Sequence, residues 1–262
     1  MKTGFKNSVV WNKLFNFQKD AVLGAIDKIE KFNGCIIADS VGLGKTFEAL
    51  AVMKYYQLRN DRILLLAPKK LRENWTIYQL NDKRNILAED RLNFDVLNHT
   101  DLSRERGKSG DIDLETINWG NYDLVVIDES HNFRNNPNKR GMTRYKRLMN
   151  DVLKSNIRTK VLMLSATPVN NKMNDLKNQI AFITEANDRA FSNYGIDSVS
   201  QVMKDAQRKF TNWYKNGDPN NLDVNQLMSH LDGSYFRILD MLTIARSRKH
   251  IEKYYDTTDI GK

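Results

Sequence analysis

The sequence predicts an α/β fold, a three-layer sandwich in which a mostly parallel central sheet lies between helices, with a helical insert toward the C-terminus. Two observations predict this class. Short apolar runs at residues 35–38, 62–68, 122–127 and 160–164 alternate with segments of helical spacing. In addition, a glycine-rich turn follows the first of these runs, and two acids follow the third. Polar residues placed in this way are typical of the edge where parallel sheets bind ligands.

The composition is that of a globular protein with excess positive charge. The chain has 262 residues, of which 40% are hydrophobic and 28% are charged, and its net charge is +9. This charge favours an anionic partner, with nucleic acid ahead of a membrane, although it also fits a merely solubilising surface. No apolar span reaches the length of a bilayer and no secretory signal is visible, so we expect an intracellular protein without a membrane partner. Cys35 is the single cysteine, which excludes an internal disulfide and predicts a small buried side chain.

The first amphipathic helix precedes the glycine-rich turn. Apolar residues at helical spacing from Phe15 to Ile29 predict this helix, which ends near Asn33 and Gly34. Gln18 lies at its start. A glutamine in such a place is ordinarily an exposed helix residue, so any further role depends on what the turn binds.

The turn at residues 39–46 reads Asp-Ser-Val-Gly-Leu-Gly-Lys-Thr and leads into a predicted helix. Backbone N–H groups of such a turn point toward a polyphosphate on the N-terminus of the helix. In this pattern the Lys45 ammonium binds the β- and γ-phosphates of ATP, and the Thr46 hydroxyl binds Mg²⁺. The general pattern has glycine where this chain has Asp39, so the match is partial. The predicted ATP-binding residues are Gly42, Leu43, Gly44, Lys45 and Thr46, with Gln18 as the contact to adenine.

Cations and polar residues follow the runs at residues 62–68 and 94–98, which are the second and third predicted strands. The candidate nucleic-acid contacts there are Lys69, Lys70, Arg72, His99 and Thr100. The three cations lie at a helix start, where they oppose the helix macrodipole. An anionic strand passing over this edge would explain them, although a solvated basic face stays open. Hydroxyl and imidazole groups could bond phosphates, and His99 is also consistent with a plain cap or turn residue.

The strand predicted at residues 122–127 delivers Asp128 and Glu129 at its end. Burying adjacent acids without a cation is costly, so a purely structural role is disfavoured. We expect Asp128 to bind the same Mg²⁺ as Thr46, and Glu129 to orient and deprotonate the attacking water. The predicted catalytic residues are therefore Lys45, Asp128 and Glu129, and the predicted metal ligands are Thr46 and Asp128.

A further strand at residues 160–164 ends in Ser165, Ala166 and Thr167. Small hydroxyl side chains at this position can bond the acidic pair without crowding it. The tripeptide means nothing alone, and it gains specificity only because it follows Asp-Glu-Ser-His in the same sheet. Helices are predicted on either side of this strand, at residues 144–153 and 170–184.

After residue 184 the pattern changes to polar helical segments. We predict an ATP-binding unit over residues 1–184, a helical insert over 185–234, and a basic closing segment over 235–262 that is helical to about residue 255. The cations of the closing segment are Arg246, Arg248, Lys249 and Lys253. A basic helix face is usually only solvated, and a face toward DNA or another lobe is the alternative.

Taken in order, five motifs of this chain resemble those of one family. They are Gln18, Asp-Ser-Val-Gly-Leu-Gly-Lys-Thr at 39–46, Leu-Leu-Leu-Ala-Pro-Lys-Lys-Leu-Arg-Glu-Asn-Trp at 64–75, Asp-Glu-Ser-His at 128–131, and Leu-Ser-Ala-Thr-Pro-Val-Asn-Asn at 164–171. Together they are similar to the first RecA-like lobe of superfamily-2 helicase-type ATPases. Val-Gly-Leu-Gly-Lys-Thr, Asn-Trp and the Asn-Asn after Thr-Pro resemble the Swi/Snf-like branch of double-stranded DNA translocases, in a bacterial-type form.

The resemblance implies a RecA-like P-loop fold and ATP hydrolysis that drives movement along double-stranded DNA. In such a motor His131, Ser165 and Thr167 would couple the nucleotide state to the grip on DNA. A second lobe normally supplies arginine fingers, which are worth about a thousandfold or more in rate. Nothing after residue 184 repeats the alternation of strands and helices. We therefore expect a fragment whose closing segment leads to an absent second lobe, and which turns over ATP barely at all.

The expected partners are double-stranded DNA, the second lobe of the same polypeptide, and a nuclease or a defence or repair subunit. The expected location is cytoplasmic and nucleoid-associated rather than nuclear. Two alternatives stay open, because the same chemistry permits an RNA helicase lobe and the fold permits a non-catalytic scaffold that binds nucleotide or nucleic acid. Intact Lys45, Thr46, Asp128 and Glu129 argue against a scaffold, since it has no need of all four.

Overall fold

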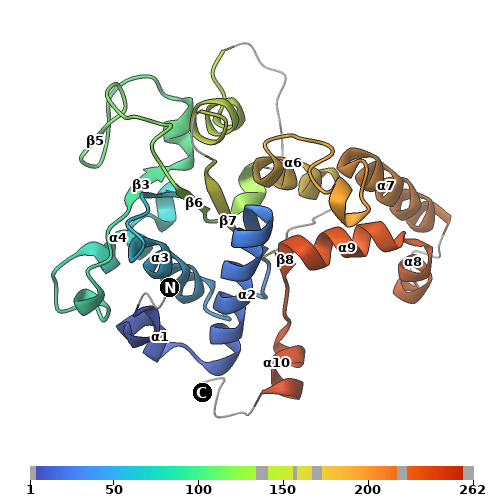
Figure 1. Ribbon diagram of the computed structural model, residues 1–262, viewed down its shortest axis with the longest axis horizontal. Coiled ribbons are helices and arrows are strands. Elements are labelled where there is room, and N and C mark those ends of the chain that lie inside the picture. Colours follow the sequence, from blue (N-terminus) through green and yellow to red (C-terminus); the bar gives the residue numbers. More distant parts are fainter. Residues whose placement is uncertain (1–3, 134–140, 156–157, 167–172, 217–222, 256–262) are drawn as a thin grey trace.

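A parallel sheet forms the centre of the protein. The computed structural model describes residues 4–133, 141–155, 158–166, 173–216 and 223–255 (Figure 1). Among these residues the main sheet has six strands in the order β3-β2-β6-β7-β1-β8, and every neighbouring pair is parallel. The strands are β1 (Gly34–Ile37), β2 (Ile63–Ala67), β3 (Asp95–Asn98), β6 (Leu124–Ile127), β7 (Lys160–Leu164) and β8 (Thr243–Ile244). Their carboxyl ends all lie at one edge, which we call the carboxyl edge.

Both faces of this sheet are buried, which explains why its strands read as continuous apolar runs. In β6, Val125 and Ile127 pack into one hydrophobic cluster, whereas Leu124 and Val126 pack into another on the opposite face. All four side chains are 0% exposed. Helices on both sides are what a parallel sheet requires. The predicted three-layer α/β sandwich is therefore confirmed.

Two groups of helices form the outer layers. One face packs against α1 (Val9–Lys13), α2 (Asn16–Phe32), α3 (Lys45–Gln57) and α4 (Glu73–Thr76). The other packs against α5 (Arg144–Lys146), the π-helical segment Arg147–Leu153 and α6 (Met173–Thr184). A small antiparallel pair, β4 (Lys108–Ser109) and β5 (Ile112–Asp113), lies in the loop after β3. Cys35 of β1 is fully buried, as predicted.

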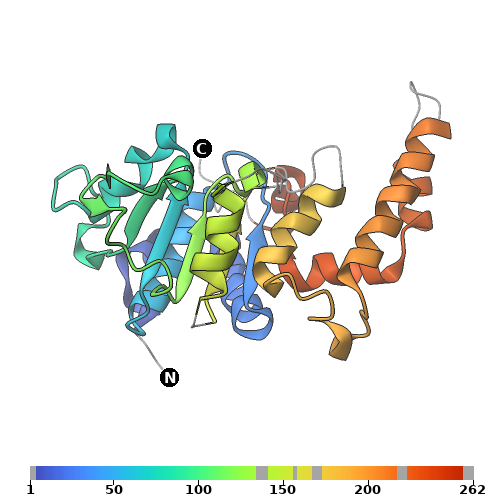
Figure 2. The same cartoon turned by 90° about the horizontal axis from the view of Figure 1, so that it is seen from above.

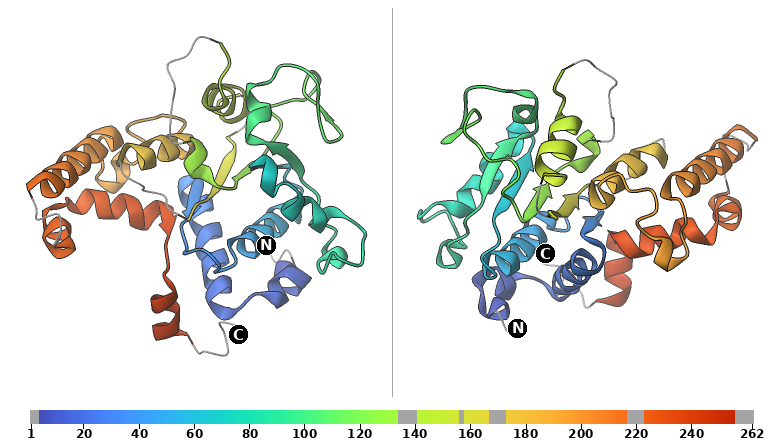
Figure 3. Two further views of the ribbon diagram at one scale, coloured as in Figure 1. Left: turned by 180° about the vertical axis from the view of Figure 1, so that it is seen from behind. Right: turned by 45° about the horizontal axis from the view of Figure 1, so that its top comes forward.

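Three further helices extend from one side of the sheet. They are α7 (Val199–Asn216), α8 (Val224–His230) and α9 (Gly233–Leu242). Figure 2 shows α7, in orange, reaching far from the sheet, and Figure 3 shows α7 beside α9. None of the helices in the described ranges has the length and apolar character that a membrane crossing needs. The division at residues 184 and 234 stays a prediction.

The closing segment departs from the continuous helix predicted over residues 235–255. Helix α9 ends at Leu242, Thr243 and Ile244 form β8 beside β1, and helix resumes only in α10 (Arg248–Tyr254). Two residues are too few to show the period of a strand, although both are β-branched and suit one. The prediction was wrong here because the pattern that identifies a strand needs more residues than β8 has.

His99 lies inside the protein at the carboxyl end of β3. It is 4% exposed, its Nε2 lies 3.3 Å from the carbonyl oxygen of Leu66, and its ring packs against Phe133 with centroids 4.8 Å apart. This burial corrects the prediction that His99 contacts nucleic acid and supports the structural alternative. Burial also lowers the pKa of the imidazole to about 4, so it is neutral in the folded protein.

Replacing His99 should reduce the loss of stability in acid. Its pKa falls from 6.5 in the unfolded chain to about 4 in the fold, so protons bind the unfolded state preferentially and stability declines as pH drops below 6.5. Between pH 7 and pH 5 this group lowers the free energy of unfolding by about 2 kcal/mol. We expect His99→Gln to lose that part of the pH dependence and His250→Gln, at an exposed histidine, to keep it. Urea titrations measure the difference, and an unchanged pH dependence in His99→Gln would contradict the buried neutral imidazole.

Candidate active site

The turn predicted to bind phosphate has the backbone shape that its glycines predict. Gly42 and Gly44 have φ values of 85° and 81°, in the left-handed region that favours glycine. A Cβ atom on Gly44 would overlap the side-chain amide of Gln18, and one on Gly42 would lie 2.7 Å from the Arg248 guanidinium. Gly44 also caps α3, so the unpaired amides of that helix lie at the turn. The turn is therefore a cradle whose backbone favours glycine at both positions and which has a helix N-terminus at its base.

Lys45, the first residue of α3, reaches back over the turn. Its ammonium donates to the carbonyl oxygen of Asp39 at 2.6 Å and to that of Ser40 at 3.3 Å. Thr46 follows it and is half-buried. Two carbonyl oxygens thus orient the cation that the sequence assigned to phosphate binding.

Asp128 follows β6 and is held at both carboxylate oxygens. The indole Nε1–H of Trp75 donates to Oδ2 at 2.9 Å, and the Glu129 amide donates to Oδ1 at 2.9 Å. Burial raises the pKa of Asp128, while the Trp75 hydrogen bond and the positive charge of Lys45 act in the opposite direction. The structure therefore brings Lys45 and Asp128 into one site, although β7 separates their strands in the sheet.

Trp75 is a site residue that sequence reasoning did not assign. It is 1% exposed and belongs to α4, which follows the basic residues after β2. A buried indole N–H needs an acceptor, and here Asp128 supplies it. The sequence offered a tryptophan just after a basic stretch, but its spacing does not identify the acceptor. One hydrogen bond therefore connects the basic segment to the acid that the sequence predicts to bind the metal.

Glu129 has a backbone conformation that is unusual for a residue with a side chain. Its φ is 49°, and such a left-handed residue costs on the order of 1 kcal/mol or more. The Asn132 amide donates to its carbonyl oxygen at 3.0 Å, which holds the turn. The carboxylate Oε2 lies 3.2 Å from His131 Nδ1, in a geometry that does not make a hydrogen bond. A strained turn therefore sets the place of the acid next to Asp128, as is typical of functional sites.

Hydroxyl groups lie behind the acidic pair. The Ser130 hydroxyl donates to Gln179 Oε1 on α6 at 2.6 Å, and both residues are 0% exposed. Gln179 was not anticipated, because in the sequence it is an ordinary helix residue. Ser165 follows β7 and is 1% exposed. Thr167 lies outside the described residues, so the coupling role of His131, Ser165 and Thr167 stays a prediction.

Gln18 lies beside the cradle and is 5% exposed. Its Nε2 donates to the Leu43 carbonyl oxygen at 3.0 Å, and its Oε1 accepts from the Phe15 amide at 3.0 Å. Each amide atom keeps one more hydrogen or lone pair. A cavity of about 600 Å³ adjoins it, with a lining that includes Phe15, Phe17, Gln18, Gly44, Phe47 and Arg248. An aromatic cavity with a fixed amide suits a purine base.

The predicted nucleic-acid residues divide into two groups. Lys69 and Lys70 are exposed directly after β2, and Thr100 is exposed directly after β3. Arg72 instead bonds within the protein, since its guanidinium donates to the Ser109 hydroxyl at 2.8 Å. Strand β2 lies next to β6 in the sheet. The exposed lysines and the acidic pair therefore share the carboxyl edge.

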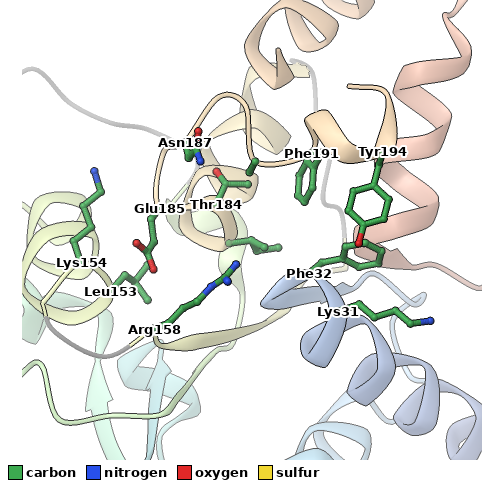
Figure 4. Close-up of a pocket in the computed structure, with 12 residues that line it drawn as sticks. Lys31, Phe32, Leu153, Lys154, Arg158, Thr184, Glu185, Asn187, Phe191 and Tyr194 are labelled. Atoms are coloured by element: carbon green, nitrogen blue, oxygen red, sulfur yellow. The ribbon is translucent and has the colours of Figure 1, made fainter. Parts of the chain in front are cut away.

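A second cavity, of about 540 Å³, lies at the opposite edge of the sheet. Figure 4 shows its lining, which includes Phe32 before β1, Arg158 before β7 and Glu185 after α6. Phe32 and Arg158 precede strands β1 and β7, and the lining includes neither the phosphate turn nor the acidic pair. The residues that the sequence predicts to act on phosphate are therefore at the carboxyl edge.

The donors at the carboxyl edge fit a nucleoside triphosphate and a magnesium ion. The glycine cradle and the start of α3 supply backbone amides, and Lys45 supplies a cation. Thr46 and Asp128 supply oxygen ligands of the kind that Mg²⁺ prefers. A divalent cation would also offset the burial that raises the pKa of Asp128.

Comparison with known proteins agrees with this site. The SNF2-related domain family matches residues 17–209 of the chain. YqhH of Bacillus subtilis, an uncharacterized ATP-dependent helicase, is 33% identical over 164 residues, which are 59% of this chain and 27% of that protein. The DNA annealing helicase and endonuclease ZRANB3 of Mus musculus is 29% identical over 180 residues, which are 64% of this chain and 16% of that protein. The chain thus spans less than a third of the length of these relatives.

Two solved structures share the fold. The SWI2/SNF2 ATPase core domain of Sulfolobus solfataricus aligns with a TM-score of 0.55 and 19% identity, over 95% of this chain and 45% of that chain. The same core in complex with double-stranded DNA aligns with a TM-score of 0.53 and 20% identity, over 95% of this chain and 46% of that chain. The fold is thus that of a RecA-like lobe. With most of its length matched, the chain belongs to the SNF2-related domain family, as a first lobe of the Swi/Snf-like superfamily-2 helicase-type ATPases.

Proposed function

We propose that this protein is the ATP-binding lobe of a motor that hydrolyses ATP to move along double-stranded DNA. The observation that carries the proposal is the meeting of the phosphate cradle, Lys45 and the Asp128–Glu129 pair at one edge of the sheet. Relatives named as ATP-dependent helicases support the use of ATP. Because those relatives are several times longer, the activity of the whole motor is part of the proposal.

Each residue of the site has a stated part in the proposed hydrolysis. The cradle amides and Lys45 hold the triphosphate, and Thr46 and Asp128 hold Mg²⁺, which neutralises phosphate charge when bound. Glu129 orients the attacking water and accepts its proton. Trp75 and the Glu129 amide hold the two oxygens of Asp128, so the ligand carboxylate is oriented in advance. A second RecA-like lobe would supply the arginine that stabilises charge on the transferred phosphoryl group.

Nucleic acid is proposed to lie along the same edge. Lys69 and Lys70 are exposed after β2, which neighbours the β6 strand that leads to the acidic pair, and Thr100 is exposed after β3 on the other side of β2. The net charge of +9 favours such a polyanionic partner. Trp75 lies between this segment and Asp128, so a shift of the lysines on DNA would reach the metal-binding acid. Duplex DNA is the proposed track, because structural and sequence relatives are named for acting on DNA.

Two substitutions separate ATP binding from hydrolysis. Lys45→Ala removes the phosphate-binding cation, and we expect the affinity for Mg·ATP to fall about tenfold or more. Glu129→Gln keeps the shape of the side chain but removes the base, so binding should persist while hydrolysis falls by about a hundredfold or more. Isothermal titration calorimetry measures the first effect. Single-turnover hydrolysis with protein in excess measures the second, because we expect slow turnover by one lobe.

Exposed residues away from the site provide the controls for these variants. Lys31→Ala and Glu115→Gln change the same residue types on the surface and should behave as wild type. If Lys45→Ala bound ATP as tightly as wild type, the cradle would not be the phosphate-binding site. Unchanged hydrolysis in Glu129→Gln would show that another group activates the water.

The lysines after β2 test the nucleic-acid edge. Lys69→Ala combined with Lys70→Ala should weaken duplex DNA binding and reduce the slope of log affinity against log salt by about 2, since each phosphate contact contributes about 0.9. The control pair is Lys31→Ala with Lys154→Ala, two exposed lysines beside the cavity at the opposite edge. Fluorescence anisotropy with duplex DNA, single-stranded DNA and RNA measures these effects. An equal loss of duplex DNA affinity in both double variants would contradict the proposed nucleic-acid edge. Tighter binding of RNA than of duplex DNA would favour the RNA helicase alternative.

A further inference from the structure

A buried ion network joins the phosphate turn to the end of the described chain. The Arg246 guanidinium pairs with Asp39 and lies 2.7 Å from Glu48 Oε1 on α3. Asp39 and Glu48 are 0% exposed, and the Arg246 side chain is 10% exposed. The same guanidinium donates to the Phe17 carbonyl oxygen and lies 5.3 Å from the centroid of its ring. Arg246 is therefore neither helical nor simply solvated, which corrects the usual expectation for a basic closing segment.

Asp39 is the residue at which this chain departs from the general phosphate-turn pattern. Its Oδ1 accepts from the Arg246 amide at 2.8 Å and from the Arg246 Nε at 3.2 Å. Its carbonyl oxygen accepts from the Lys45 ammonium at 2.6 Å. The departure thus provides an acceptor for Arg246 on the same residue that orients Lys45. Any shift of Asp39 would move the oxygen that holds the phosphate-binding cation.

Backbone hydrogen bonds run beside the ion network. The Ala38 amide donates to the Ile244 carbonyl oxygen at 2.6 Å, and the Ser40 amide donates to the Arg246 carbonyl oxygen at 3.0 Å. These bonds continue the pairing of β8 with β1 past the end of β1 and onto the turn. The turn is therefore fixed on one side by a segment that arrives from the far end of the sequence.

Helix α10 then contacts the side of the site where the base would lie. Ile251 is 0% exposed and packs with Phe17 and Leu43. Arg248 lines the cavity beside Gln18, and its Nη2 lies 3.5 Å from the Val41 carbonyl oxygen. Residues 243–254, which we call the strap, thus touch both the phosphate turn and the base cavity.

We propose that Arg246 is a positioning residue for the phosphate turn and that the strap is an integral wall of the nucleotide site. The inference rests on the proposed function, because it requires the turn to bind ATP. Without the guanidinium, the buried carboxylates of Asp39 and Glu48 must bind protons or move toward water, and either change removes the contacts of Arg246 that hold the Asp39 side chain. Because Asp39 orients Lys45, nucleotide affinity then depends on a residue 207 positions away in the sequence.

Arg246→Lys tests this with a variant that keeps the positive charge. A lysine ammonium lacks the planar fork that lets arginine bridge two carboxylates. We expect the amides of residues 40–46 to exchange hydrogen about tenfold faster than in wild type, and Mg·ATP affinity to fall about tenfold. Exchange in β2 and β3 should stay unchanged, which shows that the fold persists. Hydrogen exchange followed by mass spectrometry and calorimetry give the two readouts.

A second variant separates loss of nucleotide binding from loss of folding. Asp39→Asn, Glu48→Gln and Arg246→Met together remove the buried charges, so thermal stability should recover while nucleotide affinity stays low. Lys249→Ala, at an exposed cation of α10, is the matched control and should behave as wild type. The inference is wrong if wild-type protein binds ATP and both Arg246 variants bind it within about twofold of that affinity with unchanged exchange. If wild-type protein does not bind ATP, the proposed function fails instead, and exchange of the turn in Arg246→Lys still decides whether Arg246 holds it.

Discussion

Parallel pairing of the strands is the constraint on which this structure depends. Because β1, β2, β6 and β7 run in the same direction, the segments that follow them meet at one edge although they are far apart in the sequence. Helices bury both faces of the sheet, so polar groups that follow the strands collect at this edge. The glycine cradle, the exposed lysines and the acidic pair are therefore neighbours as a result of topology. The chemistry of the site follows from which residues the chain places at each strand end.

The sequence correctly predicted the features that depend on a local pattern of residues. The apolar run of β6 predicted a strand buried on both faces, and Gly42 and Gly44 predicted a turn that needs positive φ. The sequence did not predict β8, because that strand has only two residues. It also did not identify the acceptor of the Trp75 indole, because Asp128 lies 53 positions away. It assigned His99 to nucleic acid because a polar residue after a strand looks the same in sequence whether it faces water or the core. Pairing partners in three dimensions leave no trace in spacing, which is why the Arg246 network was also missed.

The site combines several features that each cost stability. Glu129 has a left-handed backbone, and three carboxylates, those of Asp39, Glu48 and Asp128, are largely withdrawn from water. Burial, together with the charge of Asp39, raises the pKa of Glu48. Lys45 and Arg246 provide the opposing charge. Local strain and buried charge are expected where a protein prepares a site for a polyanion and a metal ion, and here both are concentrated around the same turn.

The central claim is that a triphosphate and its metal ion bind between the glycine cradle and the acidic pair. A crystal structure with a non-hydrolysable ATP analogue and Mn²⁺ in place of Mg²⁺ tests it most directly, because manganese is located by its anomalous signal. The account predicts one manganese peak between the Thr46 hydroxyl and the Asp128 carboxylate, with the phosphates along residues 42–46. A manganese peak away from these two residues, or a triphosphate in the cavity lined by Phe32 and Arg158, would contradict it.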